Sequence, residues 1–182
     1  MQGRLVGVVG PSGVGKDSVM EALARAHDGI HLVRRVITRD EGQGGEVFER
    51  VSVAEFARRR VAGDFVLDWE AHGMRYGVPR SEVAPQMAVG RICLVNLSRG
   101  VLAEAERLFA GFVTLHLTAP DEVLAARLRG RGRESEAEIA ARLSRRDFRL
   151  PEGLGRVIEV ANDGPLERTV AQVLAALQSE KA

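Results

Sequence analysis

Two patterns of apolar and polar residues take turns along the chain, and their order predicts its secondary structure. Short, nearly continuous apolar runs are typical of strands buried on both faces of a sheet. These runs occupy residues 4–10, 31–38, 91–97, 112–119 and 156–162. The segments expected to form helices are residues 16–27, 52–63, 80–90, 99–110, 120–130 and 164–180. Because strands and helices alternate, we expect an α/β fold with a parallel sheet wrapped by helices.

Local signals mark the ends of several elements. Ser52 followed by Glu55 matches a capping box, in which a hydroxyl and a carboxylate satisfy the first amides of a helix. Gly73 predicts a turn between two short strands that flank it, and Pro85 predicts a break in the helix that contains it. No internal repeat or low-complexity linker divides the sequence. We therefore expect a single domain over residues 1–182.

The composition narrows the class of protein. The chain has 182 residues, of which 45% are hydrophobic and 28% are charged, as in ordinary globular proteins. The net charge of +1 gives no global basic signal, so we expect no nucleic-acid partner. The N-terminal segment lacks the long apolar stretch of a signal peptide or membrane helix. We expect a cytoplasmic protein without a membrane partner, and the oligomeric state stays open.

Two rare residue types stand in informative places. The single cysteine, Cys93, excludes an internal disulfide, and its apolar neighbours indicate a small buried residue rather than a reactive thiol. Among the 26 lysines and arginines, only Lys16 and Lys181 are lysines. A compact ammonium is not equivalent to a planar guanidinium. The lysine retained in a glycine-rich segment therefore indicates a chemical role for Lys16.

The glycine-rich segment GPSGVGK, residues 10–16, follows a predicted strand and precedes a predicted helix. It matches the phosphate-binding loop up to Lys16. Glycines let backbone amides turn toward an anion, and the next helix adds the partial positive charge of its N-terminus. Lys16 is then expected to reach the terminal phosphates of ATP. The predicted ATP-binding residues of this segment are Gly10, Pro11, Ser12, Gly13, Val14, Gly15, Lys16, Asp17 and Ser18.

Asp17 stands where such a loop usually carries the hydroxyl residue that meets Mg²⁺. A carboxylate oxygen suits this hard cation, and the strand of residues 91–97 lacks the second acid that is usually found at a strand end. One interpretation is that Asp17 supplies the missing charge and binds Mg²⁺, directly or through water. The other is a solvated acid that favours the first turn of the helix. The sequence leaves both open.

Over nearly the whole chain, the order and rough spacing of five segments resemble those of guanylate-kinase-type P-loop kinases. These segments are GPSGVGK, ITRD, GGE, WEAHGMRYG and RGRESEAEIAARL. Within that group, the ribose 1,5-bisphosphate phosphokinase family is more similar, through GPSGVGKDS, RVITRD, LVNLSR and the tryptophan of LDWEAHGMRYGV. The resemblance implies an enzyme of phosphonate catabolism that uses ATP and Mg²⁺ to convert a phosphorylated sugar into 5-phosphoribosyl 1-diphosphate.

The resemblance also implies a P-loop NTPase core with an acceptor-binding region near residues 35–78 and a lid near residues 127–149. The lid is expected to bring guanidinium groups to the transferring phosphoryl group and, with Lys16, to stabilise its charge. The expected lid residues are Arg127, Arg131, Arg133 and Arg142. The expected acceptor-binding residues are Arg35, Arg39, Glu46, Asp68, His72, Arg75, Tyr76 and Arg99. Asn162, after the last predicted strand, resembles the segment near adenine. Four further arginines, Arg34, Arg58, Arg59 and Arg60, are interpreted as partners in surface ion pairs.

Departures from guanylate kinases concern the acceptor. Val95 and Leu97 stand where guanylate kinases carry acids, so acceptors for the N–H groups of guanine are missing. Asp68 remains as a candidate guanine-reading acid. A guanylate kinase that converts ATP and GMP into ADP and GDP therefore stays as one alternative. A non-catalytic guanylate-kinase-like binding module is another, although such a module has little reason to keep Lys16.

Overall fold

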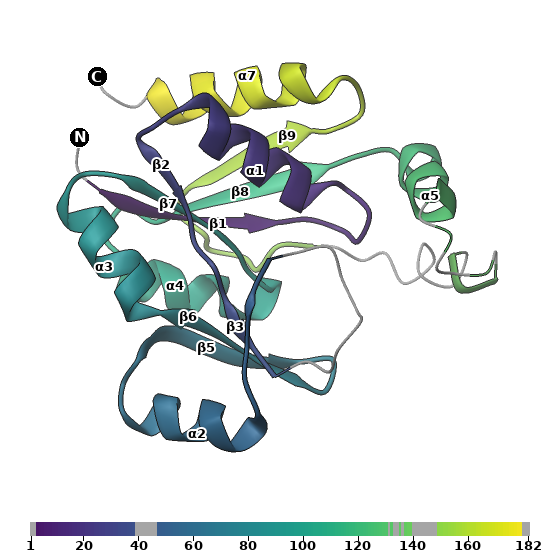
Figure 1. The fold of residues 1–182 in the computed structure, drawn as a ribbon. Helices are drawn as coiled ribbons and strands as arrows, with labels where there is room; N and C mark the ends of the chain where they lie inside the picture. The colour runs from purple at the N-terminus through teal and green to yellow at the C-terminus, as the bar shows by residue number, and fades with distance from the viewer. Residues whose placement is uncertain are drawn as a thin grey trace.

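The computed structural model describes residues 3–38, 47–130, 132, 135, 137–139 and 149–179. Within these ranges the chain forms two β-sheets. Helices cover the main sheet, and a smaller second sheet lies beside it (Figure 1). No helix in the described ranges is long and apolar enough to cross a membrane.

The main sheet has five parallel strands in the order β2-β7-β1-β8-β9. The strands are β1 (Arg4–Val9), β2 (Ile30–Leu32), β7 (Ile92–Asn96), β8 (Val113–Thr118) and β9 (Val157–Ala161). This arrangement confirms the expected α/β fold with a parallel sheet. Because the strands are parallel, their carboxyl ends share one edge, and this edge is where open α/β sheets place their ligands.

Helices cover both faces of the main sheet (Figure 1). One face packs against α1 (Lys16–Ala26) and α7 (Leu166–Gln178), and the other against α3 (Arg80–Ala88) and α4 (Leu102–Leu108). A short 3₁₀ turn, η1 (Arg99–Val101), precedes α4, and α5 (Asp121–Gly130) follows β8. Burial on both faces explains why these strands are nearly continuous apolar runs in the sequence.

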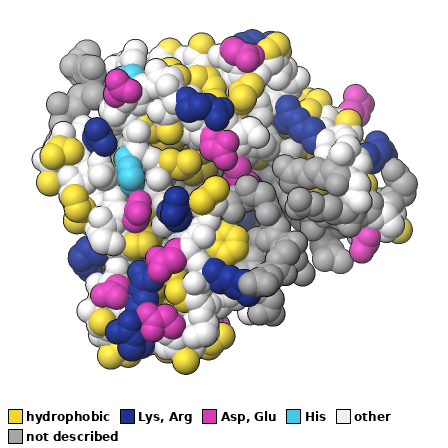
Figure 2. Space-filling view, in the orientation of Figure 1, with side chains coloured by type: hydrophobic (Ala, Val, Ile, Leu, Met, Phe, Trp, Pro, Cys, Tyr) yellow, Lys and Arg dark blue, Asp and Glu magenta, His cyan; other side chains and the backbone are white. Residues whose placement is uncertain are grey.

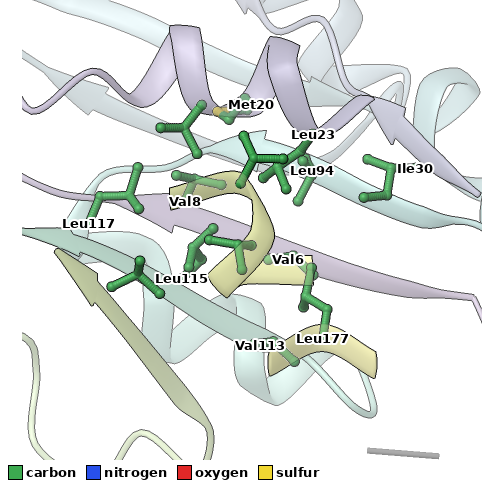
Figure 3. Close-up of a cluster of buried hydrophobic side chains, with 14 of the residues drawn as sticks. Val6, Val8, Met20, Leu23, Ile30, Leu94, Val113, Leu115, Leu117 and Leu177 are labelled. Carbon is green, nitrogen blue, oxygen red and sulfur yellow. The ribbon is translucent and has the colours of Figure 1, made fainter. Parts of the chain in front are cut away.

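Successive side chains of β1 point to opposite faces of the main sheet and belong to two different buried clusters. On one face, Val6 and Val8 of β1 belong to a buried cluster with Leu23 of α1 and Leu177 of α7 (Figure 3). On the other face, Leu5 of β1 belongs to a cluster with residues of α3 and α4. The main sheet therefore forms a rigid support for the loops at its carboxyl edge.

The second sheet has the order β4-β3-β6-β5. Its strands are β3 (Val36–Ile37), β4 (Glu49–Arg50), β5 (Phe65–Ala71) and β6 (Met74–Pro79), and α2 (Val53–Val61) packs on it through Phe56, whose ring stacks on Phe65 at 4.7 Å. The turn at Gly73 is confirmed, with positive φ at His72 and Gly73. The serine half of the predicted capping box is confirmed, since the Glu55 amide donates to Ser52 Oγ, whereas the Glu55 carboxylate accepts from Arg58 instead of a helix amide.

Two expectations about secondary structure are wrong. The apolar run of residues 31–38 is not one strand, because β2 pairs with β7 in the main sheet whereas β3 pairs with β6 in the second sheet. The chain leaves the main sheet between these two strands. Pro85 does not break α3, since its carbonyl accepts from the Val89 amide and the buried side chain of Val83 holds the helix on the core.

Candidate active site

The glycine-rich loop leads from β1 into α1, and Gly13 and Gly15 show why it needs glycine. Gly13 has φ 86° and Gly15 has φ 90°, a backbone conformation that side-chain-bearing residues rarely adopt. At Gly15 a Cβ atom would also lie 2.8 Å from Asn162 Nδ2. The Val14 amide donates to the Pro11 carbonyl at 3.2 Å and closes the turn. The loop therefore has the backbone shape that the sequence predicts.

Lys16 is the first residue of α1 and folds back over the loop. Its Nζ donates to the Gly10 carbonyl at 2.8 Å and to the Pro11 carbonyl at 3.3 Å. The ammonium group therefore lies beside the loop backbone, at the positive N-terminal end of α1. A polyanion held by the loop would meet both charges together.

Two side chains from distant segments hold the Val14 carbonyl of the loop. Asn162 Nδ2 donates to it at 2.7 Å, and Arg127 Nη1 of α5 donates to it at 3.2 Å. Asn162 is buried, and its Oδ1 accepts from Thr169 Oγ1 of α7 at 2.9 Å. The Asn162 amide thus supports the loop from inside the protein, and Arg127 begins the predicted lid segment in contact with the loop.

Asp17 lies beside the end of β7. Its Oδ1 accepts from Asn96 Nδ2 at 3.5 Å, so the unusual acid of the loop meets the strand end that lacks an acid. Within the described ranges, no group of three or more His, Cys, Asp or Glu residues is arranged to hold a metal ion. Mg²⁺ commonly uses one or two carboxylates together with substrate phosphates and water. A single carboxylate beside a phosphate-binding loop fits this mode of Mg²⁺ binding.

A cavity of about 730 Å³ lies between the loop and the second sheet. Its lining includes Lys16 from the loop side, Arg99 from η1 and Arg35 from the segment that precedes β3. Glu70 is the one carboxylate among the described lining residues, and it pairs with Arg75 at 2.9 Å. The described lining thus carries three cationic side chains and one carboxylate, and this excess of positive charge favours an anionic ligand.

Arg35 stands against an aromatic pair in the wall of this cavity. Its guanidinium carbon lies 5.2 Å from the ring centroid of Tyr76 and 5.8 Å from that of Trp69. The two rings are parallel within 6°, with centroids 5.3 Å apart. Arg35 is only 5% exposed, although it lines the cavity. These contacts hold its guanidinium group in one place.

The other predicted acceptor residues divide into three groups. His72, Tyr76 and Arg99 line the cavity together with Arg35. Asp68 does not line the cavity and forms an ion pair with Arg60 of α2 at 2.9 Å. Arg75 does not line it either, and its ion pair with Glu70 joins two exposed side chains. The remaining predictions, Arg39 and Glu46 in the acceptor region and Arg131, Arg133 and Arg142 in the lid, lie outside the described residues.

The arginines of α2 lie in ion pairs, as the sequence indicates. Arg58 pairs with Glu55, Arg59 with Glu49 and Arg60 with Asp68. Figure 2 shows basic and acidic side chains mixed on this part of the surface rather than gathered by sign. Sequence reasoning assigned no chemical role to Trp69 and no partner to Asn96. The available signals were that Trp69 is the only tryptophan of the chain and that it lies in a segment that carries the family resemblance.

Comparison with known proteins places these features in a family. Residues 6–143 match the family described as an AAA domain. The chain is 50% identical to ribose 1,5-bisphosphate phosphokinase of Ruegeria sp. (strain TM1040) over 182 residues, which cover 100% of this chain and 95% of the relative. It is 43% identical to the enzyme of the same name from Brucella melitensis biotype 2 over 166 residues, covering 90% and 85% of the two chains.

Among solved structures, the fold is similar to that of guanylate kinase from Anaplasma phagocytophilum. The TM-score is 0.68, and the match covers 98% of this chain and 86% of the other, at 22% sequence identity. This likeness concerns the fold alone.

Proposed function

The chain belongs to the ribose 1,5-bisphosphate phosphokinase family, and we propose that it converts ATP and ribose 1,5-bisphosphate into ADP and 5-phosphoribosyl 1-diphosphate. An oxygen of the sugar's 1-phosphate attacks the γ-phosphorus of ATP. The bond from that phosphorus to the β,γ-bridging oxygen breaks, and its electron pair leaves with ADP. The family relationship and the P-loop both support ATP as the phosphoryl donor.

One observation supports this assignment most directly. The cavity of about 730 Å³ is bounded by the phosphate-binding loop on one side and by Arg35 of the acceptor region on another. A donor on the loop and an anionic acceptor beside Arg35 and Arg99 would share this one space. Phosphoryl transfer needs the two substrates positioned together and their charge neutralised, and it needs little covalent chemistry from the protein.

The reaction needs no side chain to remove a proton from the acceptor. The second pKa of a phosphate monoester is about 6, so a 1-phosphate oxygen is largely ionised at neutral pH. The remaining obstacle to the reaction is the electrostatic repulsion between ATP and ribose 1,5-bisphosphate, which are both polyanions. Lys16 neutralises part of this charge when its Nζ leaves the Gly10 and Pro11 carbonyls for phosphate oxygens.

Mg²⁺ is the second element of charge neutralisation in this proposal. Asp17 is the residue that would hold the ion, directly or through water, with Asn96 fixing the carboxylate from the end of β7. When bound, the ion would supply positive charge that offsets the charge of the donor phosphates. The solvated-acid interpretation of Asp17 is less well supported, because the carboxylate contacts Asn96 rather than standing apart from other side chains.

Two regions complete the proposed single domain. Residues 35–78 form the acceptor-binding region, which includes most of the second sheet. Residues 127–149 form the lid, in which Arg127 contacts the loop and Arg131, Arg133 and Arg142 approach the transferring phosphoryl group on closure. Arg39 and Glu46 are proposed to join the acceptor site from the same region.

The position of Asp68 argues against a guanylate kinase. This residue is the best candidate for a guanine-reading acid, and it faces Arg60 of α2 rather than the cavity. Val95 and Leu97, where guanylate kinases carry acids, are both buried. The described lining of the cavity therefore offers cations for phosphate, and its one carboxylate, Glu70, is paired with Arg75.

An assay of three parallel reactions tests the function. The protein is incubated with ATP and Mg²⁺ alone, with added ribose 1,5-bisphosphate, or with added GMP, and ADP release and the product are measured. We expect ADP release and 5-phosphoribosyl 1-diphosphate with the sugar bisphosphate only. Turnover of GMP alone would show a guanylate kinase, and turnover of neither acceptor would show a binding module.

A further inference from the structure

The guanidinium group of Arg35 is unusual because it is buried and still lines the active-site cavity. Only 5% of the residue is exposed, and its guanidinium carbon lies over the rings of both Trp69 and Tyr76. The same cavity is lined by Lys16 and Arg99, so an arginine in its wall favours an anionic ligand.

The aromatic pair restricts how Arg35 can present its donors. A guanidinium group is planar, so contact with ring faces leaves its N–H groups directed sideways in the plane of the group. The parallel rings of Trp69 and Tyr76 come from two neighbouring strands, β5 and β6, and are paired across them. The contacts with both rings restrict where the guanidinium group lies, and its planar set of donors suits bidentate binding of phosphate.

Trp69 carries a further feature of this wall. Its indole Nε1 is buried and has no hydrogen-bond partner among the described residues. An unsatisfied buried donor normally costs free energy. This unsatisfied donor belongs to a residue that lines the same cavity as Arg35.

The position of Arg35 decides which phosphate it can serve. The phosphate that receives the new phosphoryl group must lie beside the donor, at the loop and Lys16. Arg35 precedes β3, and its ring partners belong to β5 and β6, so it lies on the wall built by the second sheet. An acceptor with two phosphates can reach both walls, whereas an acceptor with one cannot occupy both.

We propose that Arg35 binds the 5-phosphate of the acceptor, the phosphate that does not react, and so selects a sugar bisphosphate over a sugar monophosphate. Trp69 and Tyr76 are its positioning residues. This inference rests on the proposed function, because it assigns one phosphate of that substrate to one arginine. Arg99 lines the same cavity but donates to the Arg149 carbonyl at 3.3 Å, next to the proposed lid, and so stands apart from the ring stack.

The test compares two acceptors in two proteins. Wild type and Arg35→Gln are assayed with ribose 1,5-bisphosphate and with ribose 1-phosphate, which lacks the 5-phosphate. We expect Arg35→Gln to lower kcat/KM for the bisphosphate by about 10- to 100-fold, the effect of losing a charge-assisted hydrogen-bonded contact. For ribose 1-phosphate we expect kcat/KM to differ by less than about threefold between the two proteins, because this acceptor carries no 5-phosphate for Arg35 to bind.

A matched control and a positioning variant accompany this comparison. Arg58→Gln removes an exposed arginine that pairs with Glu55 and should leave both acceptors unchanged. Trp69→Leu removes one ring and should raise the KM for the bisphosphate more than it lowers kcat, without changing the KM for ATP. An equal loss of kcat/KM for both acceptors in Arg35→Gln would overturn the assignment.

A third measurement needs no variant and settles the matter if Arg35→Gln does not fold. Trp69 is the only tryptophan, so the intrinsic tryptophan fluorescence of the wild-type protein reports this wall alone. Ribose 5-phosphate, which carries only the phosphate assigned to Arg35, should change the emission saturably, and ribose 1-phosphate should have a weaker effect. The absence of a saturable change with ribose 5-phosphate would contradict the inference. Failure of the wild type to turn over ribose 1,5-bisphosphate would instead contradict the proposed function.

Discussion

Asn96 Nδ2 lies 3.5 Å from Asp17 Oδ1, which joins the end of β7 to the first turn of α1. The acid that replaces the usual hydroxyl of the loop therefore meets an amide at the strand end where an acid is usual. We expect Asp17→Ser to raise the Mg²⁺ concentration for half-maximal activity about tenfold or more, because a carboxylate is a stronger ligand for this ion than a hydroxyl. Titration of turnover with Mg²⁺ at fixed ATP measures the change.

The same pair allows a compensation experiment. Asp17→Ser combined with Asn96→Asp moves the carboxylate to β7 and restores a hydroxyl to the loop, so we expect the Mg²⁺ requirement to return toward that of the wild type. Binding of a non-hydrolysable ATP analogue at several Mg²⁺ concentrations gives a readout independent of turnover. An unchanged Mg²⁺ dependence in Asp17→Ser would leave the acid without a metal role.

Lys16→Ala should abolish transfer while the fold survives. The ammonium group would no longer neutralise the donor phosphates, and loss of such a group lowers kcat by about 1,000-fold. The side chain is only partly buried and donates to two loop carbonyls, so the unfolding temperature should change little. Arg25→Ala, which removes an exposed cation in the last turn of α1, should stay active. A fully active Lys16→Ala enzyme would refute the mechanism.

Asn162→Ala should loosen the loop from α7. The buried amide donates to the Val14 carbonyl and accepts from Thr169, so its loss should lower the free energy of unfolding by about 1–3 kcal/mol. We also expect a higher KM for ATP, because the loop loses its support. Asp163→Ala, which removes an exposed partner of Arg168, serves as the control. Equal thermal stability of wild type and Asn162→Ala would show that the two hydrogen bonds do not hold the loop.

Asp68→Asn should leave acceptor binding unchanged. Its carboxylate pairs with Arg60 on the α2 side, and partly exposed ion pairs contribute about 1 kcal/mol or less to stability. The KM for ribose 1,5-bisphosphate should therefore stay within about twofold of the wild type, since a contact to ligand would shift it more. Steady-state kinetics measures this value, and a tenfold rise would place Asp68 in the acceptor site.

Cys93 should be unreactive in the folded protein and should make stability depend on alkaline pH. Burial, followed by the nearby Glu82 carboxylate, raises the pKa of the Cys93 thiol from 9.0 to about 11. The folded protein then binds more protons than the unfolded chain between these values. The thiol's contribution is complete below pH 9.0 and is lost as the pH rises toward 11, an effect of about 2 kcal/mol.

Urea unfolding at several alkaline pH values measures this loss, with Cys93→Ala as the reference. The two proteins share every other titrating group, so the difference between their slopes isolates the thiol. A thiol reagent should modify wild-type protein only on unfolding. Rapid modification of the native state, or equal slopes, would contradict the buried neutral thiol.

The nucleotide half of the site could be predicted from the sequence because its determinants are local. Gly13 and Gly15 supply backbone angles that other residues rarely adopt, and the apolar run before them and the amphipathic segment after them define a strand and a helix. The Ser52 hydroxyl caps α2 by accepting from the amide of Glu55, three residues further along the chain. Features of this kind depend on neighbours in the chain.

The run of residues 31–38 shows where such local information ends. Its apolar residues are buried or partly buried in both halves, but Ile30–Leu32 pairs with β7 and Val36–Ile37 pairs with β6. Both halves satisfy the same hydrophobic pattern in different sheets. Only the strands that accept their hydrogen bonds, contributed by segments far along the chain, decide that the run divides.

The sequence by itself determined the α/β order of elements and the phosphate-binding loop that contains Lys16. The tertiary structure alone decided that Asp68 faces Arg60, that Arg35 lies between the cavity and the rings of Trp69 and Tyr76, and that Asn162 supports a loop 148 residues away. The physical reason is the direction in which each side chain points from its strand. Successive side chains of a strand point to opposite faces, so the pairing of distant strands determines which of them reach the site.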